Sequence, residues 1–393
     1  KTDDMQVIFE ALNHRGVELS QSDLVKNLLF RLVEEQGDHS QAEKLLTEHW
    51  LPLDGPRWRV EQVTGRIRRS RLDLVVAYWL TIQKRDVVKV ENLFDAFKAW
   101  MLDGNRSAAE VIKALRTVAD MYDWLLSTKP DESTKQFIDH LVATKTNTLW
   151  PVVLATYLSD VIPDDQKSKV AKVLTSYLMR RQVCRATSKD YNRYFVSLIA
   201  TVCDALDGRA GDALEQALAK NAAESRSWPT DIEFLTALLD QNIYGLTKPQ
   251  VRAFFAGVEN HLRDGLAEDT TRVRANYNVL NIEHVMPQSW WANWPLPVPE
   301  DADEETIAEA RASRSKVVNS LGNLTLTNGK LNSAMSNDKW ENKLGYLRSK
   351  STFLITTASI LSRPEGIKWT ADRDWVADWT EANIASRTGY LIG

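Results

Sequence analysis

Residues 277–288 (YNVLNIEHVMPQ) and 320–332 (SLGNLTLTNGKLN) are the two stretches that decide the fold near the carboxy-terminal end of the chain. Both are short and rich in β-branched residues and asparagine, which favour strands and turns. They predict two short strands with turns, and a helical pattern over residues 337–355 follows them.

The remainder of the chain carries helical patterns. Near the amino terminus, residues 5–36 predict a helix that ends at Gly16 and a second helix capped by Ser20 or Ser22. Over residues 72–206, apolar side chains recur three and four residues apart, and no segment shows sustained alternation. We therefore predict a mainly α protein, a helical bundle with a small strand-containing unit near its end. The predicted regions are residues 1–36, 37–225 and 226–393.

The composition is that of a globular protein. Lysine and arginine number 49 against 53 aspartate and glutamate residues, a net charge of −4. This balance excludes a uniformly basic protein that coats nucleic acid, but it leaves local basic patches open. Hydrophobic residues make up 44% and charged residues 26%, which argues against disorder. Because no apolar run is long enough to cross a membrane and no signal peptide is visible, we expect a soluble protein without membrane association.

The cysteine content indicates the cellular compartment. Cys184 and Cys203 are too few for a disulfide framework or a four-thiolate zinc site, so we expect a reducing cytoplasm. The sequence begins at Lys1 inside an apolar pattern, and we therefore expect it to be a fragment of a longer protein.

Two segments are locally basic. Residues 57–71 contain six arginines and one glutamate, a local charge of +5, and residues 180–193 contain five basic residues and one aspartate, a local charge of +4. Both are candidate phosphate-contacting surfaces, although a solvated helix face or internal salt bridges explain each segment equally well. The candidate DNA-binding residues in these segments are Arg66, Arg68, Arg69, Arg180 and Arg181.

The candidate catalytic and metal-binding residues lie in or next to the two predicted strands. Glu283 and His284 form an acid–histidine pair at a strand end, and Pro287 forces a turn after them. Asn323 on the second strand and Asn332 at the start of a helical region bring amide oxygens to the same small space. Oxygen ligands with a single histidine suit Mg²⁺ or Mn²⁺ better than zinc. Since a neutral imidazole accepts a proton from water and a metal stabilises charge on phosphate, the residues indicate phosphodiester hydrolysis.

These residues resemble the His-Asn-His nucleases of the ββα-metal fold, whose pattern is Asp or Glu-His-x-x-Pro, then Asn-Leu, then a third Asn or His on the helix. The resemblance implies a small carboxy-terminal ββα-metal unit. Carried over by position, Glu283 matches the acidic metal ligand and His284 the general base. Asn323 matches the middle asparagine, which in that family braces the loop that holds the base.

The last part of the motif allows alternatives. Asn332 matches the third position, a metal ligand or phosphate contact, but Asn328 or Asn337 could take its place. Either Lys339 or Lys343 falls where a basic residue of the family faces the scissile phosphate. We assign Lys343 to catalysis and Lys339 to DNA binding.

The gap between the histidine and the middle asparagine is longer than in compact members of that family. It holds a tryptophan-rich stretch and an acidic segment, residues 300–309, that predicts a helix. Core packing and a grip on a base or strand are equal alternatives for the tryptophans, which are Trp290, Trp291 and Trp294. The cysteine pairs that bind zinc in some members are absent.

A second resemblance covers more of the chain. Residues 9–20 (FEALNHRGVELS) and 22–27 (SDLVKN) are similar to the end of the ParB-like nucleotide-hydrolysing domain of GmrSD/SspE-type modification-dependent restriction endonucleases. Residues 176–184 (SYLMRRQVC) and the stretch that continues through 189–195 are similar to a recurrent segment of the same family. In that family a helical region and a His-Asn-His nuclease follow the amino-terminal domain. The nucleotide-hydrolysing motif itself is absent, so this fragment should lack that activity.

The resemblance implies restriction of foreign DNA, sensed through a modification such as a glucosylated base or a backbone phosphorothioate. We therefore expect a DNA endonuclease that depends on Mg²⁺ or Mn²⁺, nicks or cleaves double-stranded DNA, and works with or without other defence subunits. Two alternatives remain: a helical DNA-binding module with an inactive nuclease remnant, and an RNA-directed nuclease.

Overall fold

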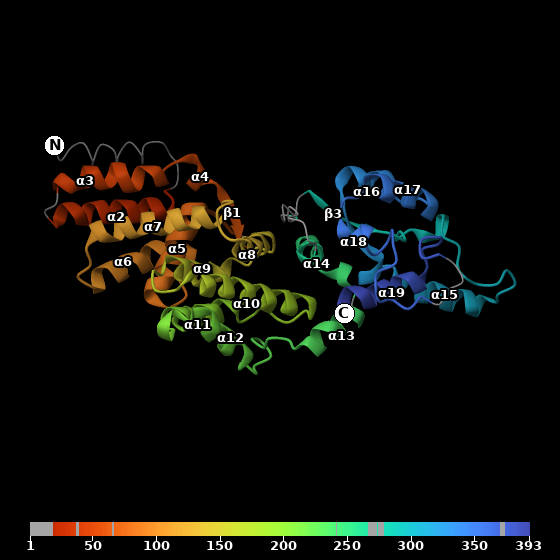
Figure 1. The fold of residues 1–393 in the computed structure, drawn as a ribbon. Helices are drawn as coiled ribbons and strands as arrows, with labels where there is room; N and C mark the ends of the chain where they lie inside the picture. The colour runs from red at the N-terminus through yellow and green to blue at the C-terminus, as the bar shows by residue number, and fades with distance from the viewer. Residues whose placement is uncertain are drawn as a thin grey trace. The chain divides into compact units, whose positions relative to one another are not determined.

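The computed structural model describes residues 19–36, 39–64, 67–240, 242–265, 273, 279–369 and 374–393. The described chain is mainly helical, as predicted, and contains two two-stranded sheets, β1–β2 and β3–β4 (Figure 1). It divides into two compact units. The first comprises Lys1–Lys135, Lys145–Val173 and Ser188–Lys220, and the second comprises Gln136–Thr144, Leu174–Thr187 and Asn221–Gly393. The predicted division into three regions stays a prediction, and residues 9–18 of the ParB-like resemblance lie outside the described residues.

The first unit is a helical bundle. Its helices are α2 (Gln21–Glu35), α3 (His39–Leu45), α4 (Pro56–Arg59), α5 (Arg71–Lys84), α6 (Leu93–Asp103), α7 (Ala108–Leu125), α9 (Trp150–Leu158), α11 (Tyr191–Cys203) and α12 (Ala210–Ala219). Two further helices, α8 (Glu132–Ala143) and α10 (Asp164–Val183), contribute residues to both units. Within the described residues, none of the helices is both long and apolar enough to span a lipid bilayer.

Helix α5 is the centre of the first unit, because every residue over positions 72–81 is buried. A helix that is apolar on all sides has to be enclosed by its neighbours, and α2, α7 and α9 surround it. Ser20 caps α2 in a reciprocal box with Asp23, which confirms one of the two predicted caps. The buried carboxylate of Asp73 accepts a hydrogen bond from the backbone N–H of Ser22 at 2.7 Å and so joins α5 to α2.

The sequence did not predict the hairpin before α5. Strands β1 (Glu61–Thr64) and β2 (Ile67–Ser70) pair in antiparallel register, with Glu61 opposite Ser70 and Gln62 opposite Arg69. The two strands are only four residues long, and polar side chains on both faces hide the two-residue period from which a strand is recognised.

The second unit holds the other sheet. Strand β3 (Leu280–His284) pairs antiparallel with β4 (Leu324–Asn328), and both lie inside the stretches where strands were predicted. The predicted acidic helix is present as α15 (Glu304–Val317), and the predicted final helical stretch contains α17 (Trp340–Lys350). The other helices of this unit are α13 (Asp231–Asp240), α14 (Lys248–Asp264), α16 (Gly329–Met335), α18 (Leu354–Thr357) and α19 (Glu381–Ile392).

Two apolar clusters flank the sheet. Leu280 of β3 and Leu324 and Leu326 of β4 belong to a cluster that includes Phe254 and Phe255 of α14. The second cluster contains the loop after β3 and a group of tryptophans from distant parts of the chain. Its main members are Val285, Met286, Trp290, Trp294, Trp340, Trp375 and Trp379. The end of β3 therefore lies where the two clusters meet.

A buried arginine joins α19 to the start of β4. The guanidinium of Arg387 donates to the carbonyl oxygens of Gly322, Leu324 and Ile355 at 2.7–2.9 Å and to the hydroxyl of Ser359. Burial lowers the pKa of Arg387 to about 9. Because these carbonyl groups have no access to water, the arginine supplies the hydrogen bonds that they would otherwise lack.

Substitution of Gly322 tests this packing. A methyl group at Gly322 would overlap the carbonyl oxygen of Ile384 and the hydroxyl of Thr388, both in α19. We expect Gly322→Ala to lower the free energy of unfolding by about 1–3 kcal/mol. Gly345→Ala in α17 is the matched control, since nothing lies within 4 Å of its added methyl group, and it should stabilise by about 0.5–1 kcal/mol. Urea denaturation checks both values, and an equal response of the two variants would contradict the packing argument.

Candidate active site

Strand β3 places Glu283 and His284 on opposite sides of the sheet. Glu283 is opposite Thr325 and His284 opposite Leu324 in the strand register, and successive side chains of a strand point to opposite faces. Both side chains are buried, with 7% and 8% of their surface exposed. After His284 the chain leaves the sheet through Val285 and Met286, so the pair lies at the end of a strand, as the sequence predicted.

Asn323 fixes the loop that follows His284. Its side chain is completely buried. Its Oδ1 accepts hydrogen bonds from the backbone N–H of Met286 at 2.8 Å and from Trp379 Nε1 at 3.1 Å. Its Nδ2 donates to the carbonyl oxygens of Met286 and Val318, both at 2.8 Å. The backbone of Val285 also donates to the Asn323 carbonyl at 2.9 Å, so one residue determines the path of the loop.

Lys343 lies on the Glu283 side of the sheet. Its Nζ is 2.7 Å from Glu283 Oε1 and donates to the carbonyl oxygen of His284 at 2.8 Å. Burial raises the pKa of Glu283, and the charge of Lys343 opposes that shift. Burial likewise lowers the pKa of Lys343, against the effect of Glu283.

This placement corrects one expectation. Lys343 was predicted to face the scissile phosphate, but only 1% of its surface is exposed. A buried carboxylate requires a counter-charge, and Lys343 supplies it. Lys339, at the start of α17, is exposed, and of the two lysines it is the one that a phosphate could reach.

The imidazole of His284 is held from two sides. Its Nε2 lies 2.9 Å from Asn319 Oδ1, and the ring of Tyr244 packs edge-on against it with centroids 4.4 Å apart. Burial lowers the pKa of His284 to about 4; Asn319 opposes this shift and the charge of Lys343 adds to it. The imidazole is therefore neutral at pH 7, which is the form that accepts a proton.

Asn332 is the best placed of the three candidate asparagines. It lies half-buried in α16, and its Oδ1 accepts a hydrogen bond from Thr327 Oγ1 at 3.4 Å. Thr327 lies two residues after Thr325, which is opposite Glu283 in the strand register. Its side chain is therefore on the same face of the sheet as that of Glu283. Asn328 caps α16 by accepting from the backbone of Leu331 at 2.8 Å, so turn chemistry accounts for it. Asn337 is exposed.

The donors near Glu283 suit a hard divalent cation. In the part of the chain that the structure describes, no group of three or more His, Cys, Asp or Glu side chains is placed to hold a metal ion. Mg²⁺, however, is commonly bound by one or two carboxylates and completed by water and substrate phosphates. The carboxylate of Glu283 and the amide oxygen of Asn332 are oxygen ligands of this chemical kind, and Lys343 already binds the Glu283 carboxylate.

The predicted DNA-binding arginines have different surroundings. Arg66 lies outside the described residues, whereas Arg68 of β2 is exposed and 3.6 Å from Glu61. Arg69, next to it, is half-buried and donates to the Arg68 carbonyl at 3.0 Å. In the second unit, Arg180 pairs with Asp231 at 2.5 Å. Of the four candidate arginines that the structure describes, Arg68 is the one whose side chain is exposed.

The DNA-binding expectation is wrong for Arg181. Only 1% of its surface is exposed, and its guanidinium donates to the carbonyl oxygens of Thr187, Ser225 and Ser227 at 2.5–2.9 Å. A guanidinium that supports these loops cannot contact DNA.

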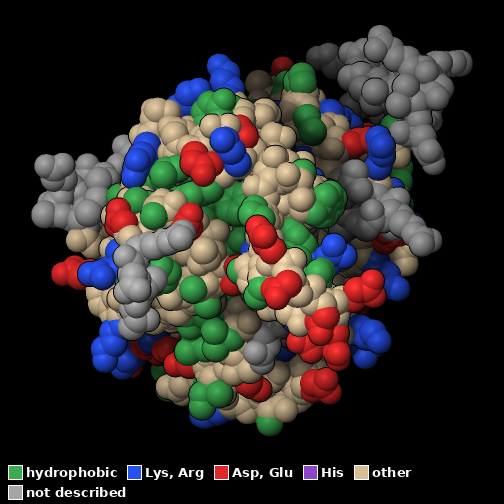
Figure 2. All heavy atoms as spheres, turned by 90° about the vertical axis from the view of Figure 1, so that its right-hand side faces the viewer, with side chains coloured by type: hydrophobic (Ala, Val, Ile, Leu, Met, Phe, Trp, Pro, Cys, Tyr) green, Lys and Arg blue, Asp and Glu red, His purple; other side chains and the backbone are tan. Residues whose placement is uncertain are grey.

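The tryptophans of the insertion separate into two groups. Trp290 and Trp294 are buried in the second cluster, which confirms core packing for these two. Trp291 is 70% exposed. Exposed acidic side chains lie before and along α15, and acidic side chains also gather in one region of the face drawn in Figure 2. Negative charge repels phosphate, so the outer side of α15 is a poor DNA surface.

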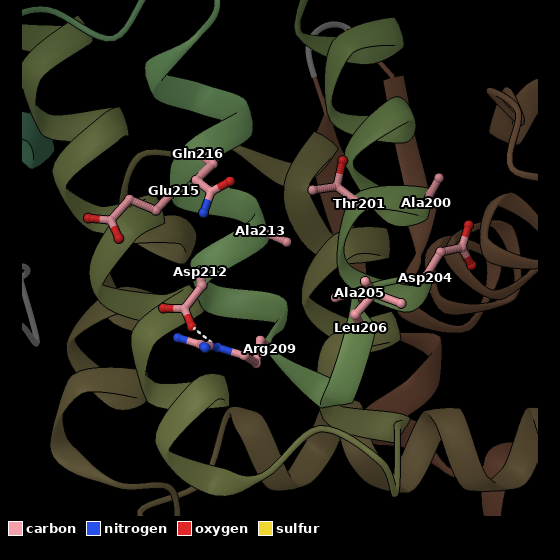
Figure 3. A pocket seen from close by; sticks show the side chains of 10 residues that line it. All are labelled: Ala200, Thr201, Asp204, Ala205, Leu206, Arg209, Asp212, Ala213, Glu215 and Gln216. Carbon is pink, nitrogen blue, oxygen red and sulfur yellow. Dashed lines mark hydrogen bonds and ion pairs between the residues drawn. The ribbon is translucent and has the colours of Figure 1, made fainter.

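A hollow of about 700 Å³ lies in the first unit (Figure 3). Its lining includes Asp204, Asp212 and Glu215, and their carboxylates form ion pairs with Arg85, Lys169 and Arg209. Because these charges are already paired with one another, the hollow offers a phosphate no unpaired cation among these groups.

Sequence reasoning assigned no role to three residues of the site. Asn319 and Gln288 hydrogen-bond to each other beside His284, and Tyr244 contacts its ring. Asn319 lies just before the Ser-Leu-Gly-Asn stretch, where asparagine is equally typical of a turn, and Tyr244 comes from a remote 3₁₀ turn, Ile243–Gly245. The sequence contains no signal that distinguishes these roles.

The buried pair between Lys343 and Glu283 can be tested by a double-mutant cycle. Lys343→Met leaves the Glu283 carboxylate buried without its counter-charge, and we expect it to lower the free energy of unfolding by about 3 kcal/mol. Combining it with Glu283→Gln should restore most of this loss, because the uncompensated charge is gone. Urea denaturation of the four proteins measures the coupling. Additive effects of the two substitutions would rule out the buried pair.

The carboxy-terminal part of the chain matches a known protein family. Residues 228–393 match the sequence profile of the C-terminal domain of GmrSD restriction endonucleases. No curated protein matched the chain. The matched region includes β3, β4, α16 and α17, together with Lys343, which contacts Glu283, and Asn319 and Tyr244, which contact His284. Residues 228–393 are therefore a C-terminal domain of the GmrSD restriction endonuclease type.

Proposed function

We propose that this protein is a metal-dependent endonuclease that nicks or cleaves foreign or modified double-stranded DNA in restriction. The observation that carries the proposal is the neutral, oriented imidazole of His284 at the end of β3, inside the region that matches a restriction endonuclease domain. We further propose that β3, β4 and α16 form a ββα-metal nuclease unit of the His-Asn-His type.

In the proposed reaction, His284 takes a proton from a water molecule, and the resulting hydroxide attacks the phosphorus. The P–O bond to the leaving oxygen breaks, and that oxygen takes a proton from solvent. Glu283 and Asn332 would hold Mg²⁺ or Mn²⁺, which when bound supplies positive charge for the phosphate and the leaving oxygen. Asn323 keeps the loop after His284 in place, and Lys343 orients the Glu283 carboxylate.

The proposed DNA contacts lie outside the catalytic pair. Arg68 and Arg69 belong to the β1–β2 hairpin, which lies within the basic segment of residues 57–71, and Lys339 is exposed at the start of α17. Both cysteines are free thiols, and we propose the reducing cytoplasm as the place of action. We further propose that other defence subunits and an amino-terminal nucleotide-hydrolysing domain act together with this nuclease.

Cleavage of supercoiled plasmid tests the proposed reaction. With Mg²⁺ the protein should convert plasmid DNA to nicked or linear form, and EDTA should prevent this. His284→Ala should reduce the rate by about 10²–10⁴-fold, the usual contribution of a general base. His261→Ala, which changes an exposed histidine of α14, is the matched control and should retain the wild-type rate. Equal rates for wild type and His284→Ala would overturn the proposal, as would cleavage of RNA in preference to DNA.

The salt dependence of DNA binding tests the hairpin surface. Replacing both Arg68 and Arg69 with alanine should weaken binding similarly for all sequences. It should also reduce the slope of log K against log salt by about 2, one unit for each lost phosphate contact. Lys172→Ala changes an exposed basic residue of α10 and should leave the slope unchanged. Fluorescence anisotropy over a salt series measures the slope, and identical slopes would exclude the hairpin from the DNA surface.

A further inference from the structure

The amide of Asn319 connects two donors beside His284. Asn319 Oδ1 lies 2.9 Å from Gln288 Nε2 and 2.9 Å from His284 Nε2. The glutamine nitrogen can only donate, so it identifies this end of the asparagine side chain as the acceptor. An amide oxygen likewise cannot donate, and His284 Nε2 must therefore carry the hydrogen of this contact.

Both partners of the contact are fixed by their surroundings. Asn319 is half-buried, and the carbonyl of the preceding residue, Val318, is held by Asn323 Nδ2 at 2.8 Å. The ring of His284 is confined by Tyr244, whose plane makes an angle of 70° with it. The imidazole therefore cannot turn over to exchange its two nitrogens without breaking these contacts.

A neutral imidazole with its hydrogen on Nε2 has its lone pair on Nδ1. No protein atom in the described part of the chain hydrogen-bonds to His284 Nδ1; the polar contact of this ring is the one through Nε2. Nδ1 is thus the nitrogen that can accept a proton from water.

We propose that Asn319 is a positioning residue that fixes the tautomer of His284, with Gln288 fixing the orientation of the Asn319 amide. The catalytic meaning of this inference rests on the proposed function, whereas the tautomer itself does not. When Nδ1 takes a proton from water, the ring becomes an imidazolium whose Nε2–H still donates to Asn319. The hydroxide that remains forms the new P–O bond while the bond to the leaving oxygen breaks.

Nitrogen NMR of histidine-labelled protein near neutral pH tests the tautomer without any cleavage assay. The His284 signals are assigned by their loss in His284→Gln. We expect a protonated Nε2 and an unprotonated Nδ1 in the wild type. Asn319→Leu should move both signals toward the average of the two tautomers, and Asn319→Asp, which retains an acceptor oxygen, should restore the wild-type pattern. A wild type with the hydrogen on Nδ1, or an Asn319→Leu spectrum identical to wild type, would overturn the proposal.

Plasmid cleavage provides the second measurement. Asn319→Leu should lower kcat by about 10²-fold with little change in KM, because DNA binding does not use the tautomer, and Asn319→Asp should recover activity. Asn105→Leu, which changes an exposed asparagine between α6 and α7, is the control and should leave kcat unchanged. A wild type with the expected tautomer but no cleavage would refute the proposed function and leave the tautomer inference standing. Cleavage by a wild type whose His284 carries its hydrogen on Nδ1 would refute the tautomer inference and leave the proposed function standing.

Discussion

The buried amide of Asn323 is the interaction on which the rest of the second unit depends. A fully enclosed amide requires a hydrogen-bond partner for each of its polar groups, since an unpaired group in the interior costs roughly 1–3 kcal/mol. Its partners are the loop after β3, the carbonyl before β4, and Trp379 of the segment that precedes α19. Satisfying one side chain thus brings three distant parts of the chain together, and it does so beside His284.

Two buried cations reinforce this arrangement. Lys343 lies within hydrogen-bond distance of both the Glu283 carboxylate and the carbonyl oxygen of His284, so it links the acidic side chain to the backbone of its neighbour. Arg387 of α19 binds the carbonyl oxygens of Gly322 and Leu324, the residues on either side of Asn323. Neither cation is exposed to solvent. The basic residues closest to the site are thus structural, and positive charge for a phosphate has to come from exposed residues or a bound cation.

The sequence predicted those parts of the fold that depend on local pattern. Strands β3 and β4 and helices α15 and α17 lie in segments whose composition and spacing favour them, and Ser20 carries a recognisable cap. What could not be predicted depends on partners far away in sequence. Lys343 meets Glu283 across 60 residues, and Arg181 binds carbonyl groups up to 46 residues away, so their charge wrongly suggested exposed positions.

The same limit applies to the candidate site. Glu283, His284 and Asn323 could be predicted as site residues from the sequence, because the residues of the motif fall at the ends of the predicted strands. The family profile supports the nuclease class. Asn319 could not be selected, because asparagine near a turn is ordinary and its contact with His284 spans 35 residues. The metal and the roles of the individual residues remain predictions that rest on the chemistry of the donors.

The insertion between the strands also affects how the protein folds. Met286 and Asn323 are 37 residues apart, and Trp379 joins the same cluster from 56 residues further along. The entropy of closing such loops has to be overcome before these contacts stabilise anything, so they form late. During synthesis, the chain therefore cannot complete the environment of His284 until Trp379 has been made. A nascent or truncated chain would accordingly lack an organised nuclease centre.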